Sequence, residues 1–440
     1  MGLLGGIFGS PKLQPEQKRS LKHEQVTDLT YSVALAMLEG TFIGVIADKI
    51  YAVPAFVIAI LISAPFLGSL SSYFWARLAN ARPKVPIIVV LQFLVVACLL
   101  VVAVAPLNNV GSMLLVIGVV CARTLTAGVI TIRSVVWSLN YPRDVRARTT
   151  GRLQVVTSLV IVLTTVIAAP VLDANPMTFR WIYAVAILIS LFGVMTFARL
   201  HVVGERRQRV RERHSVKVAR SLKMRFRFFR ILRQDKRFAR YQTYQFLNGI
   251  SNLSIEAPLI FLVSRELQAS YTVSLTILNV LPFFFSTLTI PLWARYLDRV
   301  HITHFRTRIS GVWVLSQLLV WLGAMFQSFI LLGIAGVVKG VARSGGSLGW
   351  QLGHNDFAPL DKLSDYMSVH VTLTGIRGAI AGVLGIGLYV GWSGFGWLPD
   401  FPGIKAQLFL VCMVIGVISW LGFIRMHADM KREQARSRVG

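Results

Sequence analysis

Hydrophobic residues run along the chain in twelve stretches of roughly 20 residues, separated by shorter polar segments. A helix of about 20 apolar residues crosses a hydrocarbon core about 30 Å thick, so each stretch predicts a transmembrane helix. Six stretches precede a polar segment near the middle of the chain, and six follow it. The predicted spans are 27–46, 54–76, 85–105, 111–139, 151–172, 179–200, 241–263, 271–292, 308–326, 329–352, 366–392 and 404–425.

The central segment from His201 to Arg240 carries fifteen Lys or Arg residues against three acids, so it must lie outside the membrane. Leu222, Phe226, Phe229 and Leu232 recur at helical spacing among its arginines. This pattern predicts an amphipathic helix in the headgroup region that is held by anionic lipids. The alternative is that these charges only fix the orientation of the protein in the membrane, as the positive-inside rule describes.

The hydrophobic pattern divides the chain into five parts. We expect an N-terminal cytoplasmic tail over 1–26, a six-helix bundle over 27–203, a basic cytoplasmic linker over 204–238, a second six-helix bundle over 239–426 and a C-terminal cytoplasmic tail over 427–440.

Composition agrees with a membrane protein, because only 15% of the 440 residues are charged, where a soluble protein has about 25%. The net charge of +27 is concentrated in connections on one side. Those connections and the central segment hold twenty-seven Lys or Arg residues, whereas the opposite loops hold only Lys49, Arg180, Arg265 and Lys405. The asymmetry predicts a multi-pass protein of the plasma membrane (the inner membrane in bacteria) with both termini cytoplasmic, and it argues against nucleic-acid binding.

The two halves share landmarks at a nearly constant offset in the sequence. Trp75-Ala-Arg77 returns in the second half as Trp293-Ala-Arg295, Glu39 returns as Glu256, and Asn140 returns as Asn355. The three offsets agree to within three positions. Two related six-helix halves are typical of a transporter that rocks around a site at the midplane.

These features resemble the major facilitator superfamily over about residues 27–425. That family has a signature loop, Gly-x-x-x-Asp-Arg-x-Gly-Arg-Arg, between spans two and three, and often a degenerate copy between spans eight and nine. Here the second copy, Trp293-Ala-Arg295-Tyr-Leu-Asp298-Arg299, fits better, because the first has Asn80 in place of the family's Asp. The resemblance implies an all-α integral membrane fold of twelve transmembrane helices in two pseudo-symmetric six-helix bundles. It also implies a cytoplasmic gate that contains Arg77, Arg295, Asp298 and Arg299.

Six ionisable residues fall near mid-membrane: Glu39, Arg123, Glu256, Lys339, Arg343 and Arg377. Each would cost about 3 kcal/mol on a lipid-facing helix. Their sum, on the order of 18 kcal/mol, exceeds a typical net stability of about 5–15 kcal/mol, so they must face a polar cavity or one another.

The family resemblance places spans one, four, seven and ten around the central cavity. We therefore expect Glu39 and Glu256 to be symmetry-related cavity carboxylates, with Arg123 and either Lys339 or Arg343 as partners. The alternative is a set of static salt bridges that hold the helices in register. Desolvation or a neighbouring base could tune either carboxylate for proton coupling.

The six charges sum to +2, which favours a small anionic or zwitterionic substrate. No P-loop and no metal-ligand spacing is present, so we expect no ATP-driven transport, no enzymatic activity, no cofactor and no metal. The sequence predicts a monomeric secondary transporter that works by alternating access and is driven by a proton or other ion gradient, or by the gradient of the substrate itself. The alternative is a membrane receptor or scaffold that has a transporter-like fold and uses the basic segment as a docking surface.

Overall fold

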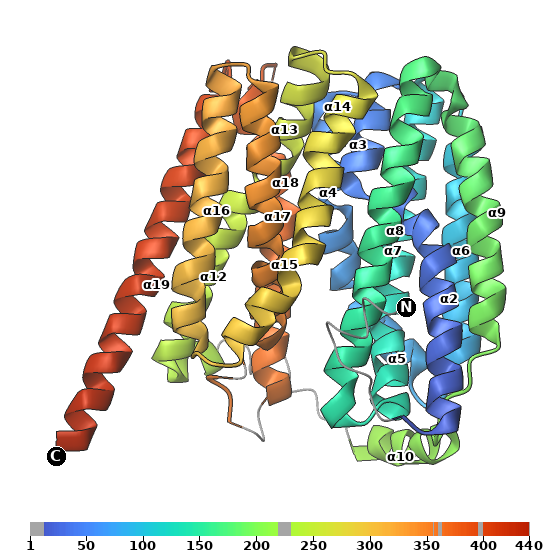
Figure 1. Ribbon diagram of the computed structural model, residues 1–440, viewed down its shortest axis with the longest axis vertical. Coiled ribbons are helices and arrows are strands. Elements are labelled where there is room, and N and C mark those ends of the chain that lie inside the picture. The colour runs from blue at the N-terminus through green and yellow to red at the C-terminus, as the bar shows by residue number, and fades with distance from the viewer. Residues whose placement is uncertain (1–12, 219–229, 355, 360–362, 395–398, 440) are drawn as a thin grey trace. The chain divides into compact units, whose positions relative to one another are not determined.

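The computed structural model describes residues 13–218, 230–354, 356–359, 363–394 and 399–439. Its long elements are all helices (Figure 1). In chain order the elements are α2 (Pro15–Met37), α3 (Gly40–Lys49), α4 (Ala55–Leu70), α5 (Ser72–Ala79), α6 (Lys84–Val104), α7 (Asn109–Asn140), α8 (Arg143–Ala174), η1 (Pro176–Thr178), α9 (Phe179–Ala198), α10 (Glu205–Val218), α12 (Lys236–Leu253), α13 (Glu256–Phe261), η2 (Leu262–Glu266), α14 (Tyr271–Leu275), η3 (Thr276–Val280), α15 (Leu281–Leu297), α16 (Ile302–Met325), α17 (Phe329–Leu352), α18 (Leu363–Val390) and α19 (Gln407–Val439).

Among the described residues, eleven helical segments are long and apolar enough to cross a membrane. A twelfth is the pair α4 and α5, which is bent by 42° at Ser71. The all-α, twelve-span fold expected from the sequence is confirmed.

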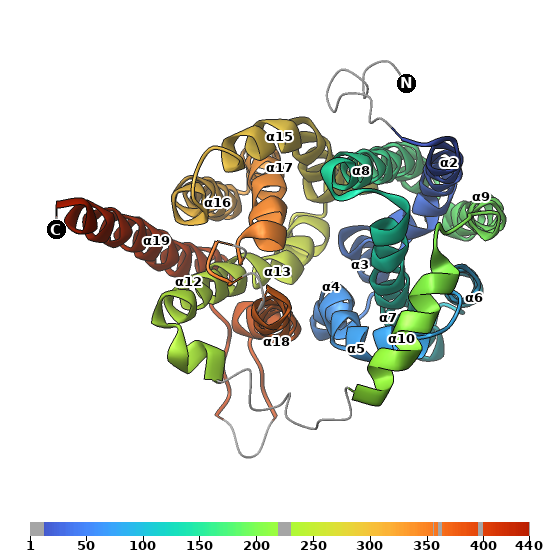
Figure 2. The ribbon, with the colours of Figure 1, turned by 90° about the horizontal axis from the view of Figure 1, so that it is seen from below.

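The described residues form two compact units. Those within 13–57, 64–218 and 270–275 form unit 1, and those within 58–63, 230–269 and 276–439 form unit 2. In unit 1, α2 packs against α8 and α9, while α6 packs against α7 and α9 (Figure 2). In unit 2, α17 packs against α15 and α16, while α19 packs against α12 and α16.

The same packing motif recurs in both units. Trp75 lies against Gly128, where an added Cβ would come within 2.8 Å of the indole ring, and Trp293 lies against Gly345 at 3.0 Å. The two glycines are separated by nearly the same sequence offset as the two tryptophans. A larger side chain at Gly128 would displace the Trp75 ring, and one at Gly345 would first meet Ile309, 2.4 Å from the added Cβ.

The first long helix begins before the predicted span. Helix α2 starts at Pro15, so the polar residues before Thr27 belong to the helix. Glu24 and Asp28 are 0% and 3% exposed. Hydropathy alone starts the span at Thr27, after Glu24, whereas the fold buries both acids beside a basic partner described below.

The first and seventh spans are both broken in mid-membrane. In the first span, α2 ends at Met37 and α3 begins at Gly40, because Glu39 has an extended backbone (φ −59°, ψ 131°). In the seventh span, α12 ends at Leu253 and α13 begins at Glu256, but Ser254 and Ile255 between them keep right-handed helical dihedrals, so it is the hydrogen-bond pattern that is interrupted. The break before Glu256 follows from Pro258, which has no N–H to donate to the preceding turn.

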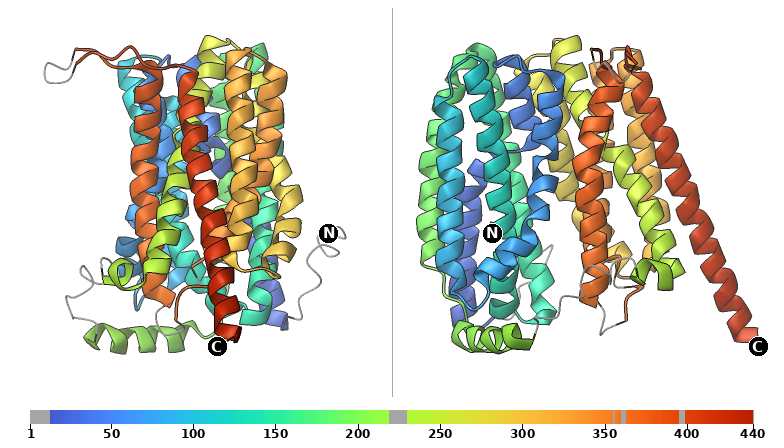
Figure 3. Two further views of the ribbon diagram at one scale, coloured as in Figure 1. Left: turned by 90° about the vertical axis from the view of Figure 1, so that its left-hand side faces the viewer. Right: turned by 180° about the vertical axis from the view of Figure 1, so that it is seen from behind.

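The basic linker contains helix α10, which lies crosswise to the long helices of unit 1 (Figure 3). Leu222, Phe226 and Phe229 of the predicted amphipathic helix lie outside the described residues, as does the repeat landmark Asn355. Two acidic residues of α10 form hydrogen bonds to unit 1. Glu205 accepts a hydrogen bond from the Lys84 backbone (2.7 Å), and Glu212 accepts hydrogen bonds from Ala81 N and Lys84 Nζ (both 2.7 Å).

Candidate functional site: carboxylate–base pairs at two broken helices

In unit 1 the candidate site is centred on Glu39, which lies at the break between α2 and α3 and caps the N-terminus of α3. Its Oε2 lies 3.5 Å from Nη2 of Arg123, which projects from α7. The same guanidinium nitrogen donates a hydrogen bond to the carbonyl of Leu38, the residue before the break. Arg123 therefore satisfies both a side-chain carboxylate and a backbone carbonyl that the helix break exposes.

In unit 2 the equivalent site is centred on Glu256, the first residue of α13. Its Oε2 accepts a hydrogen bond from Lys339 Nζ of α17 at 2.7 Å. Both side chains are mostly buried, with 19% and 11% of their surface exposed. Such a pair is stable in a membrane only because each charge compensates the other.

The two pairs are related by the sequence repeat. Arg123 and Lys339 are separated by nearly the same offset as Glu39 and Glu256. The sequence left open whether Lys339 or Arg343 pairs with Glu256, and the structure selects Lys339. Each pair lies within one unit.

Arg343 lies one turn beyond Lys339 but has a different neighbour. Its guanidinium carbon lies 3.9 Å from the centroid of the Phe283 ring of α15, in cation–π geometry. This contact holds the side chain without neutralising its charge.

Arg377 of α18 is only 7% exposed. Its Nη1 donates to the backbone carbonyl of Gln245 at 2.5 Å, and its side chain lies over Gly249, where a Cβ would come within 2.3 Å of Nε. Gly249 thus leaves the space that Arg377 occupies beside α12.

A third charged cluster, which sequence reasoning missed, lies in unit 1. Arg133 of α7 donates to Glu24 through Nε and Nη2 (3.0 and 2.8 Å) and to Asp28 through Nη1 and Nη2 (2.7 and 3.0 Å). Glu24 also accepts hydrogen bonds from Trp137 Nε1 (2.6 Å) and Tyr141 Oη (2.9 Å). Two carboxylates therefore share one guanidinium. The spacing of Glu24 and Asp28, one helical turn apart, was the signal that could have revealed the cluster.

The four residues expected at the cytoplasmic gate lie at helix ends. Arg77 is exposed near the end of α5. Arg295 is exposed in the last turn of α15, Asp298 caps that helix, and Arg299 follows it. All four are accessible, and their part in a gate stays a prediction.

Comparison with known proteins identifies the family. The model of the Major Facilitator Superfamily matches residues 29–382, most of the chain, and the chain therefore belongs to this superfamily. The membership confirms the resemblance that the signature loops indicated. No curated protein matches the chain significantly.

Solved structures share the fold at low sequence identity. The nucleoside transporter NupG superimposes with a TM-score of 0.67 at 12% identity, over 94% of this chain and 99% of that one. A D-xylose-proton symporter gives 0.65 at 12% identity, over 92% and 97%. A POT family transporter in complex with 5-aminolevulinic acid gives 0.65 at 12% identity, over 94% and 95%.

Proposed function

We propose that this protein is a secondary active transporter that moves a small anionic or zwitterionic solute across the plasma membrane by alternating access, with the proton as coupling ion. As a transporter it would have no enzymatic activity. The observation that carries the proposal is the repeated arrangement of a carboxylate at a helix break and a base on the facing span. Irregular backbone at membrane depth is tolerated where it is buried in protein or lines a water-filled cavity.

The charge balance supports the proposed substrate class. Glu39 with Arg123, and Glu256 with Lys339, neutralise one another in pairs. Arg343 and Arg377 then account for the remaining +2 of the six predicted site charges. Arg343, held on the Phe283 ring with no acid paired to it among the described residues, is the candidate for binding an anionic group of the solute.

The cluster around Arg133 supports proton coupling. Its two carboxylates and one guanidinium carry a net charge of −1 in a buried setting. Glu24 accepts from three different side chains, so it is the better stabilised anion. Asp28 is then the group that can take up a proton while Arg133 keeps a charged partner in Glu24.

The competing function is a receptor or scaffold that uses the basic linker as a docking surface. The charged pairs at corresponding positions of both units argue against it, because ionisable residues within membrane spans are costly and typically mark a functional site. Loss of activity on trimming the linker, with full activity retained in the Glu39 and Glu256 variants, would favour the scaffold.

The test is charge movement in proteoliposomes on a solid-supported membrane, with a panel of organic anions, zwitterions and cations and an imposed pH gradient. We expect a saturable current that Glu39→Gln and Glu256→Gln reduce at least tenfold and that Asp28→Asn uncouples from the pH gradient. Glu433→Gln is the matched control, because Glu433 is an exposed acid of α19 outside the site. Absence of current and of radiotracer exchange in folded protein would refute the proposal.

A further inference from the structure

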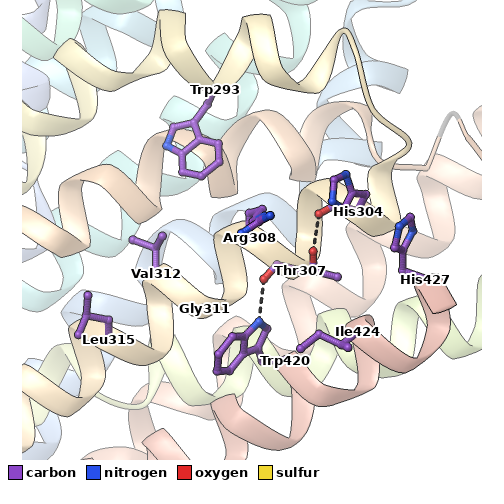
Figure 4. A pocket seen from close by; sticks show the side chains of 10 residues that line it. All are labelled: Trp293, His304, Thr307, Arg308, Gly311, Val312, Leu315, Trp420, Ile424 and His427. Carbon is purple, nitrogen blue, oxygen red and sulfur yellow. Dashed lines mark hydrogen bonds between the residues drawn. The ribbon is translucent and has the colours of Figure 1, made fainter.

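Unit 2 has a groove of about 650 Å³ that none of the site residues lines. It is formed by one side of the first half of α16, the middle of α19 and the indole of Trp293 from α15 (Figure 4). The Leu315 and Ile424 side chains on its walls are 47% and 40% exposed, so the groove opens onto the surface of the unit.

One end of the groove is cationic. Arg308 is exposed there, beside His304 and His427, whose rings stack with centroids 4.8 Å apart. Nδ1 of each imidazole has a hydroxyl neighbour: Tyr296 Oη lies 3.3 Å from His304, and Thr303 Oγ1 lies 3.2 Å from His427.

The nearby acids of α19 do not neutralise this end. Asp429 pairs with Arg240 at 2.8 Å, and Glu433 pairs with Arg237. Nε2 of His427 is buried and has no hydrogen-bond partner in the described structure. The end therefore offers the uncompensated positive charge of Arg308 to an anion, beside two stacked imidazoles.

The other end of the groove is apolar. Val312 and Leu315 line it (Figure 4). Between the two ends, Trp420 is fixed by a hydrogen bond from its indole N–H to the carbonyl of Thr307 at 2.7 Å. The helical path along α16 from His304 to Leu315 corresponds to roughly 16 Å. The groove therefore has a polar end and an apolar end. The distance between them matches the distance between the headgroup of a lipid and the upper part of its acyl chain.

We propose that this groove binds one anionic phospholipid of the cytoplasmic leaflet, with the phosphate at Arg308, beside the His304 and His427 rings, and an acyl chain along Val312 and Leu315. The choice of leaflet rests on the proposed orientation, in which the start of α16 is cytoplasmic. Charge favours an anionic lipid over a zwitterionic one. The apolar half favours a lipid over a free phosphate, because only a lipid fills both ends.

Native mass spectrometry of the full-length protein, with phosphatidylglycerol or phosphatidylcholine added to the delipidated sample, tests the proposal. We expect one phosphatidylglycerol to bind more tightly than phosphatidylcholine, and Arg308→Gln to weaken it about tenfold, the effect of losing one charge-assisted hydrogen bond. Val312→Trp, which fills the groove without changing charge, should weaken both lipids.

Arg425→Gln is the matched control, because Arg425 is an exposed arginine of α19 that does not line the groove. If the basic linker were the lipid-binding site, all variants would bind the lipid with the same affinity. Unchanged phosphatidylglycerol affinity in Arg308→Gln would overturn the proposal, as would full displacement of the lipid by inorganic phosphate. The readout needs no transport, so it is independent of the proposed function.

Discussion

At the scale of single residues, the two site pairs each compensate a glutamate carboxylate within a membrane span, but they use different bases. In unit 1 the helix break exposes the Leu38 carbonyl, and the forked guanidinium of Arg123 reaches both this carbonyl and Glu39. In unit 2 the Ser254 carbonyl packs against Gly385 of α18, where a Cβ would come within 2.0 Å of it. The described contact of Lys339 Nζ is with Glu256, for which a point charge is sufficient.

The pair in unit 2 makes a testable contribution to stability. Lys339→Met leaves Glu256 as an uncompensated buried charge, so we expect a loss of about 3 kcal/mol in the free energy of unfolding. Adding Glu256→Gln should recover a large part of it, because no buried charge then remains. Thermal unfolding of the purified single and double variants measures both effects.

Arg237 and Glu433 provide the control for that cycle. They form an ion pair whose side chains are 65% and 54% exposed. Removing either charge should change stability by at most about 1 kcal/mol. A double variant of the buried pair that is no more stable than Lys339→Met would contradict the compensation argument.

Sequence reasoning located the six mid-membrane charges but could not assign every partner. Lys339 and Arg343 are one turn apart on α17, so spacing alone favours both equally. The choice depends on Phe283, which contacts Arg343 from α15, a different helix that is distant in sequence. The cluster at Arg133 was missed because a hydropathy profile scores Glu24 and Asp28 as unfavourable in a membrane span. It contains no information on the ion pairs with Arg133 that compensate their charges.

At the scale of helices, the break in the seventh span could have been predicted, and the break in the first could not. Pro258 predicts a lost hydrogen bond to the preceding turn. The first span has no proline near Glu39; its only local signal is Gly40, a weak helix former. There the extended backbone is stabilised by Arg123, a contact between distant segments.

Helix α10 gives a prediction at this scale. Burial raises the pKa of the Glu212 carboxyl, but hydrogen bonds from Lys84, Ala81 and Gln208 outweigh burial and hold the pKa below its usual range. Because the folded pKa is lowered, this stabilisation is present above the ordinary glutamate pKa and is lost as the pH falls through the folded value. Docking of α10 should therefore be constant from pH 5 to 8 and weaken in stronger acid.

Hydrogen–deuterium exchange of α10, corrected for the intrinsic pH dependence of exchange, measures this docking. Glu212→Gln should raise exchange in α10 at neutral pH, and Glu433→Gln should leave it unchanged. Equal protection of α10 in Glu212→Gln and wild type would show that the acids do not attach the helix.

At the scale of the whole molecule, the fold was predictable because it depends on sequence properties that are averaged over many residues. Twelve apolar runs, a nearly constant repeat offset and one basic set of loops each sum over many residues, so local errors cancel. The start of the first span and the structure of the linker depend on few residues. The start of the first helix was therefore predicted less well, and the amphipathic helix of the linker stays a prediction.

The charge asymmetry predicts orientation, and labelling tests it. After replacement of Cys98, Cys121 and Cys412, a cysteine at Met177 should react with a membrane-impermeant maleimide in intact cells. A cysteine at Arg299 should react only after permeabilisation. Both native positions are exposed, so access within the fold does not limit the reaction. The reverse pattern would invert the assigned topology.

Both partners of each site ion pair belong to the same unit, and this has a consequence for how the protein can be produced. Cutting the chain between α10 and α12 would divide no described ion pair of the candidate site, and α10 would stay on the fragment that holds its partners Lys84 and Ala81. Each fragment would enter the bilayer with the site's acids already compensated. Two such fragments, translated from separate messages, are therefore expected to insert independently and reassemble into a working carrier.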